Sequence, residues 1–411
     1  MSRQKTLPSG SDQQARPTRN AIFLTFLYLG CTSFGGPVAH IGYFRTLLVA
    51  RKKWLDEQAY ADLVALCQFL PGPSSSQVGF GIGLIKGGYL GGLAAFLGFT
   101  LPSALIMLAF GIGLDAAGDA TPVSLLAGLK LVAVSVVGHA VVMMGRGLAP
   151  DWPRRGIALA AGAAVLLSGQ PLMTLVVIAG GGIAGLMLAP SSAGQPPAKT
   201  EARGGRAFVF ISIALGLLVL LPVLGRIAPS PLLDLADGFY RSGMLVFGGG
   251  HVVLPLLEVE MVDPGLISAE SFLAGYGAAQ AIPGPLFTIA AFLGQATGIG
   301  PYGITGAVVA LVMIFLGSFL LLLGVLPWWD RLRSFTRVRQ CLDGVNAAVV
   351  GLLAAVLINP IMMSAITTPV DAALALGGFA LLWRGWLSPL PVVGLIVITT
   401  MILAGLDIGP A

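Results

Sequence analysis

The chain has 411 residues, of which 56% are hydrophobic and only 10% are charged. A soluble domain carries about 25% charged residues, so this composition excludes a water-soluble globular protein and makes lipid the solvent for much of the surface. The formal net charge is only +5 and no basic run is interleaved with aromatic residues, so binding of nucleic acid is not expected.

The first twenty residues are polar, and their basic side chains are Arg3, Lys5, Arg16 and Arg19. The apolar stretch that follows has no small-residue cleavage signal. We therefore predict that residues 1–20 are a cytoplasmic tail and that the following stretch is retained in the membrane.

Several stretches reach the length of about 20 mostly apolar residues that a spanning helix needs. They are residues 91–114, 121–145, 156–189, 207–227, 301–326, 340–358 and 371–408. Two of them, 156–189 and 371–408, are long enough for two short spans each. Strands are not indicated, because the apolar runs are too long and do not alternate. The expected fold class is an all-α polytopic membrane protein.

Four other apolar stretches are interrupted by glycine and proline. The interruptions are Phe34-Gly35-Gly36-Pro37 within 21–49, Pro71-Gly72-Pro73 within 57–90, Phe247-Gly248-Gly249-Gly250 within 231–257, and Pro283-Gly284-Pro285 within 268–298. Glycine relaxes the steric preference for helix and proline removes a hydrogen-bond donor. We expect one helix to stop and another to start at each of these four breaks.

The breaks recur in the same order, which predicts a tandem repeat. Phe34-Gly35-Gly36 matches Phe247-Gly248-Gly249 at an offset of 213 residues. Gln68-x-x-Pro71-Gly72-Pro73 matches Gln280-x-x-Pro283-Gly284-Pro285 at an offset of 212 residues. A shared QxxPGP motif at a nearly constant offset is difficult to obtain by chance.

A polar, basic segment rich in Pro and Gly separates the two halves. We predict a first repeat at 21–189, a cytoplasmic linker at 190–206, an additional transmembrane helix at 207–230 and a second repeat at 231–411.

The loop charges indicate how each half is oriented, because basic loops favour the cytoplasm. The basic clusters are 1–19, 45–53, 146–155, 199–206 and 331–339, and the acidic loops without Lys or Arg are 115–119 and 258–270. If 21–49 and 231–257 are hairpins of two half-helices, every basic cluster falls inside and both acidic loops fall outside, although Arg226 is left near the outer face. The prediction is two inverted-topology repeats with re-entrant helices, an N-terminus in the cytoplasm and a C-terminus in the periplasm.

Inverted repeats with broken helices place a substrate site near the middle of the bilayer. Helix N-termini carry unpaired N–H groups and about half a positive charge, so they favour anions. The candidate substrate-binding residues at the breaks are Gly35, Gly36, Pro37, His40, Gln68, Pro71, Gly72, Pro73, Ser74, Ser75, Ser76, Gly248, Gly249, Gly250, His251, Gln280, Pro283, Gly284, Pro285 and Thr288. The alternative is that these residues only kink packed helices and that the serines only cap one. Four breaks in register favour the site.

Ionisable residues within membrane segments give the second indication, because they are costly there. Lys86 and Arg241 complete the candidate substrate-binding set, and Lys130 is a further basic candidate. Lys86 could instead extend to the interface, and Arg241 could be neutralised by Asp237 four residues earlier. His139 is interpreted as a packed polar residue.

The sequence contains no motif that indicates another chemistry. The sequence has no P-loop, no HExxH and no GxSxG, so neither nucleotide-driven transport nor an enzyme is expected. Cys31, Cys67 and Cys341 show no metal-ligand spacing, and no metal or cofactor is expected. Energy would come from a gradient of an ion such as H+ or from the membrane potential.

Three stretches of the first half, FLYLGCTSFGGPVAHIGYF, WLDEQAYADLVALCQFLPGP and SSSQVGFGIGLIKGGYLGGLAAFLGFTLPS, resemble the chromate ion transporter (CHR) family. FGGGHVVLPLLE and AAQAIPGPLFTIAAFLG in the second half resemble the same domain, as in the long two-domain members. The resemblance implies secondary active export of chromate across a bacterial inner membrane, giving chromate resistance. Another oxyanion such as sulfate, or a channel or scaffold without coupled transport, are the alternatives. The coupling ion and a homo-oligomeric state are left open.

Overall fold

A computed structural model describes residues 17–118, 122–168, 171–188, 205–247, 253–329 and 335–406. These residues form helices and turns and contain no strand, so the predicted all-α fold is confirmed. Within this described part, five helices are long and apolar enough to cross a membrane. They are Ser74–Ala117, Val123–Leu148, Ala207–Ile227, Pro301–Trp328 and Thr336–Ala365.

The described residues of the first half form seven α-helices, and those of the second half repeat their order. The first are α1 (Arg19–Thr32), α2 (Gly36–Phe44), α3 (Glu57–Phe69), α4 (Ser74–Ala117), α5 (Val123–Leu148), α6 (Trp152–Ser168) and α7 (Pro171–Gly185), with a π-helical turn η1 (Arg45–Arg51) after α2. Their counterparts are α9 (Pro231–Leu245), α10 (Val253–Met261), α11 (Ala269–Gln280), α12 (Ile289–Ala296) with α13 (Ile304–Val325), α15 (Thr336–Val356), α17 (Pro369–Trp383) and α18 (Pro389–Gly405). A π-helical turn η7 (Leu357–Met362) and the short α16 (Met363–Ala365) extend α15. The stretches 156–189 and 371–408, each predicted to hold two short spans, contain the helix pairs α6–α7 and α17–α18. All four helices are shorter than the five spanning candidates, so their crossing of the membrane stays a prediction.

The predicted breaks are helix ends. Helix α3 stops at Phe69 and α4 starts at Ser74, on either side of the first Pro-Gly-Pro. Helix α11 stops at Gln280, and a 3-10 turn η4 (Leu286–Thr288) leads into α12. Gly35 precedes α2 with a φ of 98°, and Pro37 lies in the first turn of that helix. Of the third break, Phe247-Gly248-Gly249-Gly250, the three glycines lie outside the described residues.

Each half has a second bend after its Pro-Gly-Pro motif. Helix α4 bends at Gly88, whose φ is 66°, and in the second half a short turn η5 (Pro301–Gly303) separates α12 from α13. The backbones on the two sides of each bend touch, at Gly83 against Gly91 and at Gly294 against Gly306. A side chain at any of these four glycines would collide with a carbonyl group, so glycine is required for this close approach.

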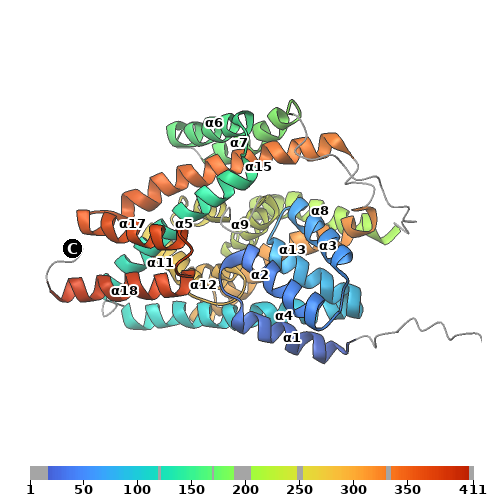
Figure 1. The fold of residues 1–411 in the computed structure, drawn as a ribbon, viewed down its shortest axis with the longest axis horizontal. Coiled ribbons are helices and arrows are strands. Elements are labelled where there is room, and N and C mark those ends of the chain that lie inside the picture. Colours follow the sequence, from blue (N-terminus) through green and yellow to red (C-terminus); the bar gives the residue numbers. More distant parts are fainter. Residues whose placement is uncertain are drawn as a thin grey trace, which may run out of the picture.

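The two halves interlock through their long helices. Helices α6 and α7 pack against α15, whereas α17 and α18 pack against α5, as Figure 1 shows at its upper and left edges. Small residues make these crossings close: Gly351 of α15 lies against the backbone of Ala158 and Gly162 in α6. The equivalent Gly138 of α5 faces Phe379 of α17. Each half therefore completes the scaffold of the other.

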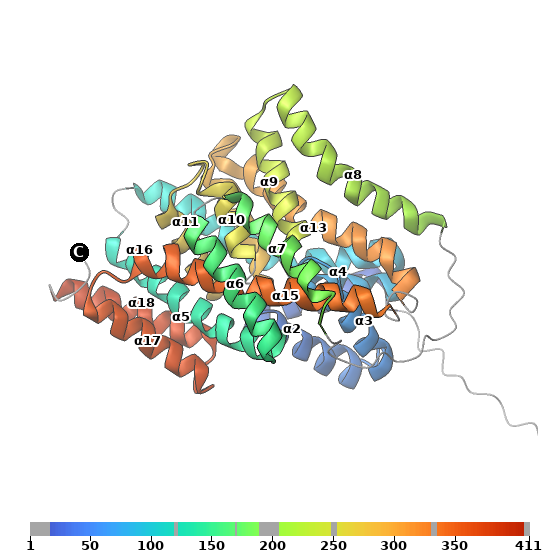
Figure 2. The same ribbon diagram turned by 90° about the horizontal axis from the view of Figure 1, so that it is seen from above.

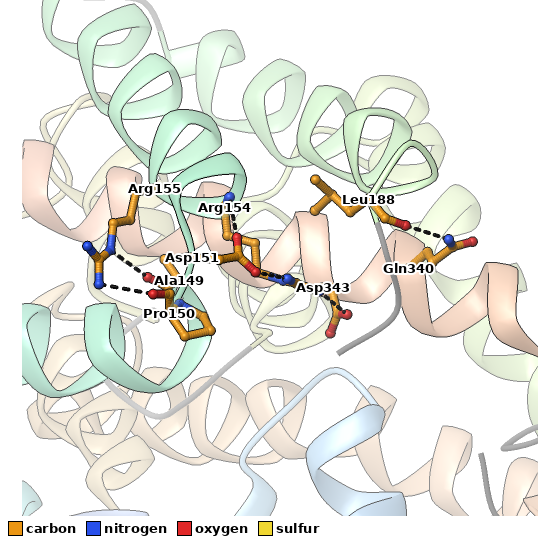
Figure 3. Close-up of polar contacts among 8 residues, drawn as sticks. All are labelled: Ala149, Pro150, Asp151, Arg154, Arg155, Leu188, Gln340 and Asp343. Atoms are coloured by element: carbon orange, nitrogen blue, oxygen red, sulfur yellow. Dashed lines mark hydrogen bonds and ion pairs between the residues drawn. The ribbon is translucent and has the colours of Figure 1, made fainter. Parts of the chain in front are cut away.

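Arg154 of α6 forms ion pairs where α6 crosses α15. Its side chain is only 6% exposed and pairs with Asp151 beside it and with Asp343 of α15, 2.8 Å away. Figure 3 shows this arginine between the two carboxylates, with Arg155 turned to the carbonyl oxygens of Ala149 and Pro150.

Helix α8 (Gly205–Ile227) has no counterpart in the first half. It lies at the edge of the molecule in Figure 2 and packs against α9 and α13. Its outer face exposes large apolar side chains such as Phe208, Val209 and Val219, as expected for a helix that faces lipid. Its position agrees with the additional helix predicted at 207–230, while the orientation of each half in the membrane stays a prediction.

Candidate functional site

Two equivalent backbone hydrogen bonds join the breaks across the halves. The amide of Gly72 donates to the carbonyl of Val246 over 2.7 Å, and the amide of Gly284 donates to the carbonyl of Ser33 over 2.8 Å. Gly72 and Gly284 are the central residues of the two Pro-Gly-Pro motifs. Ser33 and Val246 each precede the Phe-Gly-Gly of the other half. The Pro-Gly-Pro of each half is thus bound to the residue that precedes the Phe-Gly-Gly of its partner half.

Each Pro-Gly-Pro glycine also packs on a serine of the opposite half. A Cβ at Gly72 would collide with the side chain of Ser318 in α13, and one at Gly284 would lie 2.8 Å from the Oγ of Ser103 in α4. The φ angles are +117° at Gly72 and +97° at Gly284, a region that favours glycine. Sequence reasoning missed both serines. The sequence feature that could have identified them is a serine at a corresponding position in each of the two long apolar helices, α4 and α13.

A side-chain contact joins the first break to the start of α4. The Nδ1 of His40 lies 3.3 Å from the Oγ of Ser75, and His40 is fully buried. The ring of Phe99 packs edge-on against the His40 ring, at a centroid distance of 5.3 Å. With the two backbone bonds, this contact connects both Pro-Gly-Pro motifs, the first glycine break and Val246 into one cluster.

The start of α4 is held by Gln77 rather than capped by a serine. Pro73 occupies the N-cap position, and no side chain caps the helix there. The Nε2 of Gln77 donates to the carbonyl of Pro71 over 2.9 Å and to that of Ser318 over 3.2 Å. The serines that follow Pro73 are therefore not needed to cap the helix, and the capping alternative is not what the structure contains.

Several buried polar atoms of this cluster have no hydrogen-bond partner within the described residues. They are Ser33 Oγ, His40 Nε2, Ser76 Oγ, Gln77 Oε1, Thr100 Oγ1 and Gln280 Nε2. A buried polar group without a partner costs about 1–3 kcal/mol. Most of these atoms can donate a hydrogen bond, so the cluster is suited to a ligand that offers acceptors on several sides.

The predicted basic residues do not join the cluster. Arg241 pairs with Asp237 and with Glu260, both at 2.9 Å, so the predicted alternative of a neutralised arginine is present and is reinforced by a second carboxylate. Lys130 pairs with Glu270 at 2.7 Å. Lys86 lies two residues before the bend of α4, and lines an open hollow together with Arg19 and Asn20.

The other predicted residues fall in different surroundings. The hydroxyl of Thr288 donates to the carbonyl of Pro285 over 2.8 Å, so its proton is already used. Gln68 is exposed at the end of α3, whereas its counterpart Gln280 is half-buried. His139 is half-buried in α5. Gly248, Gly249, Gly250 and His251 lie outside the described residues.

Comparison with known proteins now identifies the family. The family model described as "Chromate transporter" matches residues 20–186 and 233–406, one match in each half. A protein of Pseudomonas aeruginosa named "Chromate transport protein" is 31% identical over 394 residues, which cover 93% of this chain and 91% of that protein. A protein of the same name from Cupriavidus metallidurans is 26% identical over 89% of this chain and 88% of its own length.

An uncharacterized transporter of Methanocaldococcus jannaschii is 28% identical over 85% of this chain and 86% of that protein. No solved structure matches. Because the family model matches both halves and covers most of the residues, the chain belongs to the chromate transporter family.

Proposed function

We propose that this protein is a secondary active transporter that exports chromate from the cytoplasm across the inner membrane of a bacterium and so confers chromate resistance. The observation that carries the proposal is the cluster of the two Pro-Gly-Pro motifs and the first glycine break, joined by the Gly284–Ser33 bond and extended to the other half by the Gly72–Val246 bond. It concentrates buried donors such as Ser76 Oγ and Gln280 Nε2 that have no partner in the described protein. The names of the relatives support chromate as the substrate.

The chemistry of the cluster suits an oxyanion bound by neutral donors. The N-termini that follow the two Pro-Gly-Pro motifs place partial positive charge there, and hydroxyl and amide groups add directional hydrogen bonds. The paired cations Lys130 and Arg241 are occupied by carboxylates. A site without a full positive charge binds a dianion with moderate affinity, so the anion can also be released from it.

Lys86 has a less direct role in this proposal. It shares its hollow with Arg19, which belongs to the predicted cytoplasmic tail. In the predicted topology, α3 and the first part of α4 form a hairpin whose two ends lie at the cytoplasmic face. This arrangement explains why Lys86 lies beside Arg19. Lys86 then attracts the anion towards the cytoplasmic entrance and is not a ligand at the breaks.

The test is uptake of labelled chromate into inverted membrane vesicles under an imposed proton gradient or membrane potential. Accumulation against the chromate gradient is the expected result. Uptake that only equilibrates would favour a channel, and the absence of uptake a scaffold. Competition by unlabelled sulfate decides between the two oxyanions, because sulfate has the same charge and a similar shape. Loss of accumulation on collapse of the proton gradient alone would identify H+ as the coupling ion.

A further inference from the structure

The two halves differ at one pair of equivalent helices. Helix α11 packs along α5 of the other half. Its counterpart α3 packs on α4 and η1, and makes no comparable packing with α15 in the described residues. The sequence Val-Val-Gly at 136–138 in α5 recurs at 349–351 in α15. This register makes Leu342 the counterpart of Leu129.

The contact between α11 and α5 is close and charged. The backbone of Leu129 lies directly against Gly277. A Cβ added at Gly277 would collide with the carbonyl oxygen of Leu129. Lys130 of α5 pairs with Glu270 in the first turn of α11, at 2.7 Å. Leu273, on the same face of α11, is 1% exposed. Helix α11 is thus closed against the scaffold on the side that carries the acidic loop at 258–270.

The corresponding face of α3 is open. Gln58, Ala61, Ala65 and Gln68 are all exposed, and their spacing places them on one face of the helix. We name these four residues the α3 seam. Small and amide side chains are typical of helix contacts in membranes, whereas the lipid-facing side of α8 exposes Phe208 and Val219. The composition of the α3 seam therefore fits a helix partner better than lipid.

We infer that the protein has a second conformation in which the two halves exchange these roles. In this second conformation the α3 seam packs on α15, with Ala65 opposite Leu342, and α11 is no longer packed on α5. The assignment of the α3 side to the cytoplasm rests on the proposed function and its topology. Helices α3 and α11 lead directly into Pro71-Gly72-Pro73 and Pro283-Gly284-Pro285. Their exchange exposes the anion cluster first to one side and then to the other.

Disulfide crosslinking tests the exchange in a chain whose native cysteines are replaced. The pair A65C and L342C is expected to crosslink in membranes under mild oxidation, although the helices are not packed together in this structure. The pair L129C and A274C, from the small buried cluster where α5 meets α11, is the positive control. The pair L63C and L342C is the negative control, because Leu63 is buried against Gly81 of α4. Failure of A65C–L342C to crosslink while L129C–A274C does would overturn the inference.

A bulky residue in the α3 seam provides a second readout. Ala65→Trp is expected to leave the amount of inserted protein unchanged, because Ala65 is exposed, and to reduce transport at least tenfold, because α3 can no longer close on α15. Normal transport by Ala65→Trp would contradict the inference. The crosslinks need no substrate. If the A65C–L342C crosslink forms but the unmutated protein does not move chromate, the proposed substrate is refuted and the exchange stands.

Discussion

The amide nitrogen of Gly284 donates a hydrogen bond to the carbonyl oxygen of Ser33 over 2.8 Å, across the boundary between the two halves. Its equivalent joins Gly72 to Val246. Backbone groups freed by a break at membrane depth must find partners in protein or in a cavity. Here each half supplies the partner of the other, so the breaks are stable only when both halves are assembled.

Replacing either central glycine should abolish transport. Gly72→Val and Gly284→Val force a β-branched residue into a positive-φ conformation, which costs about 1–3 kcal/mol, and the new side chain meets Ser318 or Ser103. Initial rates of chromate uptake in inverted vesicles, at matched amounts of protein, measure the effect. Gly216→Val in α8 is the control, because nothing lies within 4 Å of its Cβ position. Normal export by the Gly72→Val, Gly284→Val double variant would refute the anion placement.

Loss of the Ser76 hydroxyl should weaken binding without weakening the fold. Its Oγ is buried and has no partner in the described protein, so Ser76→Ala removes a donor that only the anion would use. One neutral hydrogen bond contributes about 1 kcal/mol, which corresponds to about a fivefold rise in KM for chromate. Ser75→Ala should have an effect of similar size. Ser364→Ala, whose hydroxyl donates to the Pro360 carbonyl over 2.8 Å, should leave KM unchanged. An unchanged KM in Ser76→Ala would exclude it as a ligand.

Neutralising Lys86 should slow transport in a salt-dependent manner. Residues 74 to 86 of α4 rise by about 18 Å at 1.5 Å per residue, so Lys86 cannot touch an anion held at the start of the helix. Lys86→Gln should raise KM at low ionic strength, and the difference should disappear at about 1 M salt, where the Debye length is about 3 Å. Lys86→Arg, which keeps the charge, should behave as the wild type. A complete and salt-independent loss of transport would instead make Lys86 a direct ligand.

Arg154 should matter for stability and not for substrate. Arg154→Met takes away the cation that Asp343 of α15 contacts at 2.8 Å. Removing one partner of a buried pair costs about 3–5 kcal/mol, and thermal unfolding in detergent should shift down by several degrees. The adjacent Arg155→Met is the matched control, because that exposed side chain bonds to the backbone carbonyls of Ala149 and Pro150 and lies over the ring of Trp152, next to it on the same helix. Equal melting temperatures for the two variants would show that the buried pair does not hold α6 on α15.

Single-cysteine labelling should reveal the orientation of the two halves. In a chain without native cysteines, Asp263→Cys should react with an impermeant thiol reagent added outside the cell, and Lys52→Cys should react only after the membrane is opened. This follows from basic loops in the cytoplasm and acidic loops outside. Equal reaction of both positions from outside would eliminate the hairpin topology.

The amino-acid sequence by itself was sufficient for the class, the breaks and the family. Hydropathy and charge content require lipid as solvent, and the conformational limits of Gly and Pro act within a few residues. For this reason the ends of α3 and α11 at Phe69 and Gln280 could be predicted. The QxxPGP repeat is also local, so it predicted two equivalent halves without knowledge of their packing.

Only the tertiary structure decided which groups meet. Glu260 neutralises Arg241 from the far side of a break, and Ser318 packs on Gly72 from the opposite half. Such contacts depend on how helices distant in sequence cross, which no local periodicity encodes. The same holds for the closed α11 and the open α3. Their sequences are equivalent in motif, and only the structure shows that α11 packs along α5 whereas α3 packs on α4 and η1.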